Sequence, residues 1–214
     1  EVIAGTDLTN KKVFDLLRGK RGSKVVLGIL RTGEKELIDF DITRGKIPIH
    51  SIDVAYMVDH ELGYIKVNRF SATTYEEFKQ ASDELLNEGM QKLLLDLRNN
   101  PGGYLGAAIN MANEFLVDNK LIVYTKGRSR DKEEYFSNAT GQLIDIDLVI
   151  LIDEGSASAS EIVAGAIQDN DRGIVAGRRS FGKGLVQEQF EYNDGSAFRI
   201  TTQRYYTPTG RCIQ

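Results

Sequence analysis

Several common features are scarce in this chain, and each absence narrows the class of protein. The 214 residues include one cysteine, Cys212, so no disulfide can form within the chain. Two histidines, His50 and His60, argue against a zinc site built from histidine and cysteine. We find no apolar run long enough to span a membrane and no signal peptide at residue 1. A formal net charge of -4 gives no electrostatic reason to expect nucleic acid as a partner.

The remaining composition is ordinary for a globular protein. Apolar residues make up 41% of the chain and charged residues 27%. The length suffices for one sizeable core, or for one core and a smaller piece. No internal repeat or low-complexity segment is present. The single cysteine fits either the cytosol or a cell envelope that uses few disulfides.

The first 43 residues contain too few expected helices and strands to form a domain. Thr9 is a plausible N-cap for a helix that ends near Gly19, and two strands are expected at 24–30 and 36–42. These elements suggest a piece of a domain. Residues 44–60, which contain Pro48, are expected to be a connector.

From about Gly63 onward, strands and amphipathic helices alternate. Short apolar runs are followed by segments with apolar residues at helical spacing, and two β-rich segments end the chain. Repeated βα units with right-handed crossovers predict an α/β fold with an open, largely parallel sheet covered by helices. The expected strands are 64–67, 93–97, 121–124, 147–152, 174–176, 185–192 and 197–205.

The first cluster of candidate functional residues is Asp-Leu-Arg-Asn-Asn-Pro-Gly-Gly at 96–103. It lies between a buried strand and a helix, the position at which open α/β sheets bind ligands. Glycines there let backbone N–H groups approach a ligand closely. The simpler alternative is a tight turn in which Asp96 and Arg98 form a structural pair.

The second cluster is Gly-Ser-Ala-Ser-Ala-Ser-Glu at 155–161. An apolar strand precedes it and a helical pattern follows it, the geometry that exposes a nucleophilic serine beside the free N–H groups of a helix start. The simpler alternative is a capping box formed by Ser158 and Glu161.

The third cluster is Ser-Phe-Gly-Lys-Gly at 180–184. With Gly177 it reproduces most of a phosphate-binding loop, and a nucleotide-binding protein that uses Gly177 to Lys183 is one hypothesis. However, Gly184 replaces the serine or threonine that holds magnesium, and a strand pattern follows where a helix is required. Lys183 could instead be a general base, or a solvated surface lysine. Neither histidine has a catalytic context, so serine with lysine is the better pairing.

Together the three clusters resemble the carboxy-terminal processing peptidases, also called tail-specific proteases. The motifs occur in the family's order, and Tyr-Thr-Pro-Thr-Gly-Arg at 206–211 resembles a further family segment. The resemblance implies a crotonase-like protease core at 44–214, preceded at 1–43 by the C-terminal part of a PDZ domain. The front of that PDZ domain, with its carboxylate-binding loop, is expected to be missing from these residues.

The resemblance also assigns roles to individual residues. It implies that Ser158 is the nucleophile, that Lys183 is the general base 25 residues later, and that Gln187 orients the lysine amine. The oxyanion hole would combine the N–H of Ala159 with that of a glycine in the Pro-Gly-Gly turn, with Gly103 favoured over Gly102. No cofactor or metal is implied.

The implied activity is that of a serine endopeptidase that cleaves protein substrates near their C-termini through an acyl-enzyme. The implied partners are proteins or peptides with accessible C-termini, and the implied location is the bacterial cell envelope, in the periplasm. A different class of function, a scaffold that binds peptide termini without cutting them, remains an alternative.

Overall fold

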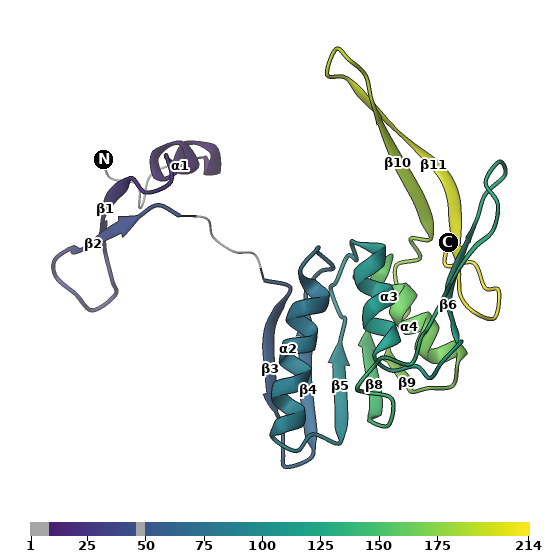
Figure 1. Cartoon of the computed structure of the whole chain (residues 1–214). Helices are drawn as coiled ribbons and strands as arrows, with labels where there is room; N and C mark the ends of the chain where they lie inside the picture. The colour runs from purple at the N-terminus through teal and green to yellow at the C-terminus, as the bar shows by residue number, and fades with distance from the viewer. Residues whose placement is uncertain (1–8, 46–49) are drawn as a thin grey trace. The chain divides into compact units, whose positions relative to one another are not determined.

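The computed structural model describes residues 9–45 and 50–214 (Figure 1). The chain divides into two compact units, Glu1–Ile49 and His50–Gln214. The expected boundary lay at residues 43 and 44. Residues 1–8 of the expected partial PDZ domain, and residues 46–49 of the expected connector, lie outside the described residues.

The first unit contains the helix and the two strands expected from the sequence. They are α1 (Asn10–Leu17), β1 (Lys24–Ile29) and β2 (Ile38–Thr43), and the two strands pair antiparallel. The Thr9 hydroxyl caps α1 by accepting the Lys12 N–H. Arg44 joins the helix to the strands, because its guanidinium donates to the carbonyls of Leu17 and Lys24.

The second unit contains two sheets and the helices between their strands. Four strands of a five-stranded sheet, in the order β4-β5-β8-β9, are parallel, and β3 pairs antiparallel with β4 at the edge. The other sheet, in the order β10-β11-β6-β7, is antiparallel. The elements are β3 (Ile52–Met57), β4 (Leu62–Val67), α2 (Thr74–Asn87), β5 (Lys92–Asp96), α3 (Leu105–Asn113), β6 (Leu121–Lys126), β7 (Glu133–Phe136), β8 (Asp147–Ile152), α4 (Ala159–Asp169), β9 (Ile174–Gly177), β10 (Leu185–Glu191) and β11 (Ala197–Tyr206).

The mixed α/β fold with a partly parallel sheet agrees with the prediction, but two strands were not expected. The expectation of a connector throughout 44–60 is wrong, because β3 occupies part of it. Most β3 side chains are exposed, so no alternating apolar pattern marks the strand; backbone pairing with β4 holds it. The other missed strand, β7, is short and similarly exposed.

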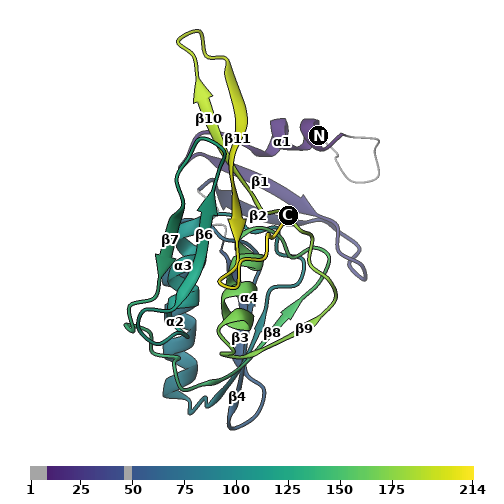
Figure 2. The same ribbon diagram turned by 90° about the vertical axis from the view of Figure 1, so that its right-hand side faces the viewer.

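The hydrophobic core lies where the helices pack against the five-stranded sheet. Ile65, Leu95 and Ile150, from three adjacent parallel strands, are fully buried. The rings of Phe78 in α2 and Phe115 just after α3 meet with centroids 5.9 Å apart. Strand β6 packs on α3 and α4, so these two helices lie between the two sheets (Figures 1 and 2).

All the predicted site motifs follow the carboxyl ends of parallel strands. The motif at 96–103 follows β5, the serine cluster follows β8, and the lysine loop follows β9. Because parallel strands end at the same edge, the three loops gather there. The hairpin β10–β11 rises from the same end of the unit (Figures 1 and 2). Within the described residues, no helix combines the length and the apolar character needed to cross a bilayer.

Candidate active site

Ser158 occupies a sharp turn between β8 and α4, as the sequence predicts. It is the N-cap of α4, with backbone angles φ 54° and ψ -110°. A positive φ is a strained conformation for a residue other than glycine, and such strain concentrates at functional sites. The capping box with Glu161 also forms. The chain therefore leaves the strand and enters the helix in the manner of a nucleophile elbow.

The serine loop is fastened to the loop that follows β5. The Asp153 carboxylate accepts the backbone N–H groups of Asn99 and Gly155 at 2.8 and 2.9 Å. Burial alone would raise the pKa of Asp153, but these hydrogen bonds outweigh it and lower the pKa. Ser156 and Ser160, on either side of Ser158, donate their hydroxyls to backbone carbonyls of the neighbouring loop at 2.8 and 3.0 Å. Their hydroxyls thus support the loop.

Both positions of the Gly-Gly pair in the Pro-Gly-Gly turn require glycine, because other backbone segments approach them closely. A Cβ on Gly102 would lie 2.7 Å from the Ala159 nitrogen and 2.8 Å from Ser158 Cβ. A Cβ on Gly103 would lie 1.9 Å from the Phe70 carbonyl oxygen. Both residues also have positive φ, 86° and 147°. The turn therefore lies directly against the serine, which only glycine at these positions allows.

Hydrogen bonding distinguishes the candidate oxyanion donors. The Gly102 N–H is occupied, because it donates to Asn100 Oδ1 at 2.9 Å. Among the described residues, neither the N–H of Gly103 nor that of Ala159 donates a hydrogen bond. Ala159 is the first residue of α4, where an N–H has no partner within the helix.

Glu161 links the serine to the lysine loop, a role that the sequence pattern did not reveal. Its Oε2 accepts the N–H of Ser158 at 2.8 Å and that of Lys183 at 2.9 Å. Its Oε1 accepts the Ser180 hydroxyl and the Gly182 N–H, both at 2.7 Å. The side chain is 6% exposed. One buried carboxylate therefore sets the distance between the start of α4 and the backbone of the lysine loop.

The side chains of Lys183 and Gln187 are both exposed. Among the described residues, no hydrogen bond joins Ser158 Oγ to Lys183 Nζ, and none joins Gln187 to either residue. The structure thus brings the backbone of Lys183, rather than its amine, to the serine. Strand β10 begins at Leu185, so the Gly177–Lys183 segment does not open the helix that a phosphate-binding loop requires.

Asp96 and Arg98 form the pair expected from the sequence. The guanidinium donates to both carboxylate oxygens at 2.7 to 3.1 Å, and the Tyr64 hydroxyl donates to Oδ2 at 2.7 Å. Burial alone would raise the pKa of Asp96, but the hydrogen bonds from Arg98 and Tyr64 and the charge of Lys66 hold it well below its usual range. Burial, with the bond to Asp96, raises the pKa of Tyr64 to about 12. The pair therefore stabilises the end of β5.

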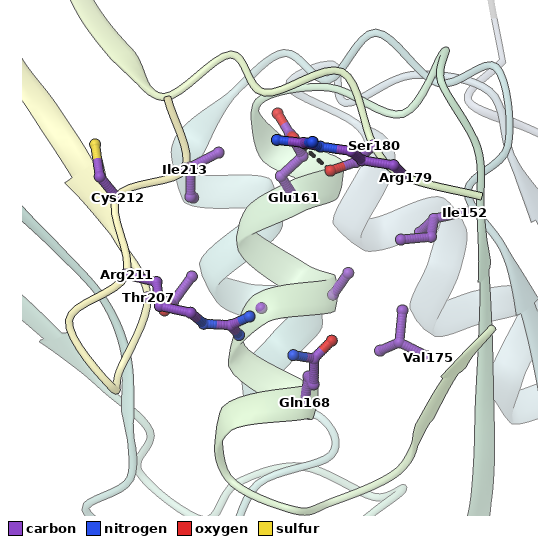
Figure 3. Close-up of a pocket in the computed structure, with 12 residues that line it drawn as sticks. Ile152, Glu161, Gln168, Val175, Arg179, Ser180, Thr207, Arg211, Cys212 and Ile213 are labelled. Carbon is purple, nitrogen blue, oxygen red and sulfur yellow. Dashed lines mark hydrogen bonds between the residues drawn. The ribbon is translucent and has the colours of Figure 1, made fainter. Parts of the chain in front are cut away.

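A cavity of about 270 Å³ runs along α4 next to this site. Figure 3 shows Glu161 and Ser180, hydrogen-bonded to each other, at one end and Gln168 at the other. Its walls come from β9 on one side and from the C-terminal segment with Thr207 and Arg211 on the other (Figure 3). Glu161 therefore lines the end of the cavity nearest Ser158.

Comparison with known proteins gives a consistent assignment. The model of peptidase family S41 matches residues 61–214. A carboxyl-terminal-processing protease of Synechocystis is 40% identical over 196 residues, which cover 90% of this chain and 45% of that protein. A probable CtpA-like serine protease of Staphylococcus saprophyticus is 38% identical over 198 residues, which cover 92% of this chain and 40% of that protein.

A solved structure gives the same result. The photosystem II D1 C-terminal processing protease is 33% identical, with a TM-score of 0.69 over 98% of this chain and 58% of that one. The present chain spans less than half the length of the two curated relatives described above. The matches cover the serine and lysine motifs and the sheet that carries them. On this evidence, the chain belongs to peptidase family S41.

Proposed function

We propose that this chain carries the catalytic machinery of a serine endopeptidase in which Ser158 and Lys183 form the dyad. The observation that carries the proposal is the Glu161 carboxylate, which binds the backbone N–H of both residues at 2.8 and 2.9 Å. It supports the pairing because it ties a strained, half-buried serine to the one loop that supplies a lysine between two glycines. The names of the relatives support proteolysis as the activity.

In the proposed reaction, Lys183 rotates its flexible side chain toward Ser158 and, as a neutral amine, accepts the hydroxyl proton. The serine oxygen attacks a peptide carbonyl, and the protonated lysine then donates to the leaving amine. Water hydrolyses the resulting acyl-enzyme with the same lysine as base. Gln187, on β10 beyond the lysine, is proposed to orient the amine. This path needs no cofactor.

The proposed oxyanion hole consists of the N–H groups of Ala159 and Gly103. Both are free of hydrogen bonds within the described residues, whereas the N–H of Gly102 already donates to Asn100. The positive end of the α4 dipole adds to the stabilisation of the oxyanion. Loss of one such donor typically lowers kcat by a factor on the order of 100 to 1000.

The wider architecture follows the same proposal. We infer that 44–214 is a crotonase-like protease core and that 1–43 is the C-terminal part of a PDZ domain, whose helix and strand pair correspond to α1, β1 and β2. Substrates would be proteins cleaved near their C-termini, in agreement with the names of the relatives. A bacterial envelope location, in the periplasm, completes the proposal.

The test uses Ser158→Ala, Lys183→Ala and Gln187→Ala in the chain and a fluorogenic peptide assay. We expect the first two to abolish cleavage, because each removes a reacting group, and the third to reduce kcat. Circular dichroism checks that each variant folds. Substantial cleavage by a folded Ser158→Ala or Lys183→Ala variant would refute the dyad. Peptide binding without any cleavage by the wild-type chain would favour a binding scaffold.

A further inference from the structure

The hairpin β10–β11 has two faces of opposite character. One face is polar and internally bonded: Arg199 donates to Gln189 Oε1 at 2.9 Å, and Gln189 in turn donates to Glu191 at 3.1 Å. The other face carries large apolar side chains that remain about half exposed. They are Phe190, Tyr192, Phe198 and Ile200, with 42, 58, 42 and 48% of their surface exposed.

The apolar side chains form one continuous surface. Phe190 and Phe198 are direct cross-strand partners, and their rings stack with centroids 5.1 Å apart. The ring of Tyr192 lies 5.7 Å from that of Phe198. We call these four residues the aromatic face of the hairpin. At the end of this face nearest Lys183, the Glu188 carboxylate forms an ion pair with the Arg130 guanidinium at 3.0 Å. The surface therefore carries no unpaired charge at that end.

The aromatic face begins beyond the part of the hairpin that packs on the core. Val186 of β10 packs against the core, and the pairing of β10 with β11 shifts between Val186 and Gln187. Side chains two residues apart on a strand share a face, so Phe190 and Tyr192, beyond this shift, project to the same side. Figures 1 and 2 show the hairpin rising beyond the core from the end of the unit at which α4 begins.

The hairpin also starts at the proposed catalytic lysine. Leu185, the first residue of β10, lies two positions after Lys183, and the Tyr205 N–H donates to the Gly184 carbonyl at 2.8 Å. A polypeptide that occupied the proposed site and extended in this direction would run along the aromatic face.

The size of the face favours a peptide over a second copy of the chain. A large aromatic side chain buries on the order of 150 to 250 Å² when covered completely. Four side chains that are each about half exposed offer roughly 400 Å², about half of the ~800 Å² per partner in a stable protein interface. Such an area matches a few side chains of an extended segment.

We propose that the aromatic face binds an apolar, aromatic-rich segment of the substrate polypeptide while another part of the same substrate lies at Ser158. The inference rests on the proposed function. It adds a substrate class: unfolded or extended chains with apolar side chains beside the cleavage position. Well-folded proteins bury such segments and would be excluded.

Binding is tested in the Ser158→Ala background, where no turnover interferes. The probes are two fluorescein-labelled peptides of about 14 residues, which span about 45 Å when extended. One carries Phe, Leu and Val at alternate positions, and the other carries Ser, Thr and Asn there. The variant is Phe190→Thr with Phe198→Thr, since threonine keeps the β propensity. Arg199→Thr, on the polar face of the same strand, is the matched control.

We expect the double variant to weaken binding of the apolar peptide about tenfold, equivalent to about 1.4 kcal/mol, with little change for the polar peptide. Arg199→Thr should change neither. Equal binding of the apolar peptide with and without the double substitution overturns the inference. So does a wild-type dimer, seen by analytical ultracentrifugation, that the double variant converts to monomer without a change in peptide affinity.

Cleavage assays in the wild-type background separate this inference from the proposed activity. A short peptide that reaches only the proposed dyad should be cleaved equally with and without the double substitution, whereas KM for the long apolar peptide should rise. If no peptide is cleaved, the dyad proposal fails, while the binding comparison still decides the role of the aromatic face.

Discussion

Glu161 offers the sharpest test of how the site is held together. In Glu161→Ala, the backbone N–H groups of Ser158, Gly182 and Lys183 all lose their acceptor. A hydrogen bond to a charged group contributes about 1.5 to 3 kcal/mol, and an unsatisfied buried donor costs a similar amount. Because the lysine loop can then relax toward water, we expect a net loss of about 2 to 4 kcal/mol of stability.

The effect on activity should be larger than the effect on folding. A displacement of about 1 Å of a catalytic group can cost a factor of about 100 in rate. We therefore expect Glu161→Ala to lower kcat/KM by about 100-fold under conditions where the variant remains folded.

Glu161→Gln should have an intermediate effect, because its remaining carbonyl oxygen can still accept from Ser158 and Lys183. Its amide group can donate to the Ser180 hydroxyl, which leaves only the Gly182 N–H unpaired. We expect a loss of about 1 to 3 kcal/mol and a fall in kcat/KM of about tenfold.

The measurements are urea unfolding and fluorogenic peptide cleavage, with Glu154→Ala as the control. Glu154 lies in the same loop, but its side chain is 70% exposed and forms a surface ion pair with Arg178, so its removal should cost less than about 1 kcal/mol. The cleavage assay is run without urea on folded protein. If Glu161→Ala keeps kcat/KM within about threefold of wild type there, the positioning argument is wrong.

Three further variants probe neighbouring features. Gly103→Ala places a Cβ 1.9 Å from the Phe70 oxygen, so we expect lower stability in urea unfolding and loss of cleavage; a fully active variant would contradict the close approach. Ser158→Gly relieves a positive φ of 54°, so its free energy of unfolding should exceed that of Ser158→Ala by about 1 kcal/mol, seen as a higher urea midpoint; equal midpoints would mean that no strain is stored. Asp96 has a lowered pKa, so its stabilising charge is fully present above the unfolded pKa of about 3.9 and is lost as pH falls through the folded value. The stability gap between wild type and Asp96→Asn should therefore narrow at acid pH, and a gap independent of pH would contradict this.

The sequence predicted the regular, buried parts of the fold well. The apolar run expected as a strand at 147–152 gives β8 with the same bounds, and the helical spacing that follows gives α4. The pattern fails where side chains are exposed on both faces. Strand β3 has exposed residues at most positions, so its existence depends on pairing with a distant strand, which no local pattern reports.

The prediction of the site was limited in a similar way. Strand–turn–helix geometry follows from local periodicity and led to the serine cluster at 155–161, whereas the family resemblance implied Ser158 within it. Glu161 was visible only as half of a capping box, since its bonds to Gly182 and Lys183 join residues more than 20 positions apart. The choice between the N–H groups of Gly102 and Gly103 depends on the hydrogen bond that the Gly102 N–H donates to the Asn100 side chain, which composition does not encode.

The capping role and the positioning role of Glu161 have a common physical origin. A helix start needs an acceptor for its free N–H groups, and a carboxylate at the third position supplies two oxygens with several lone pairs. One lone pair suffices for the Ser158 N–H, so the others remain available to a neighbouring segment. The lysine loop supplies three donors to the same carboxylate. The loop therefore cannot move away from α4 without breaking hydrogen bonds to a buried charge, and this couples the position of the proposed base to the helix that presents the proposed nucleophile.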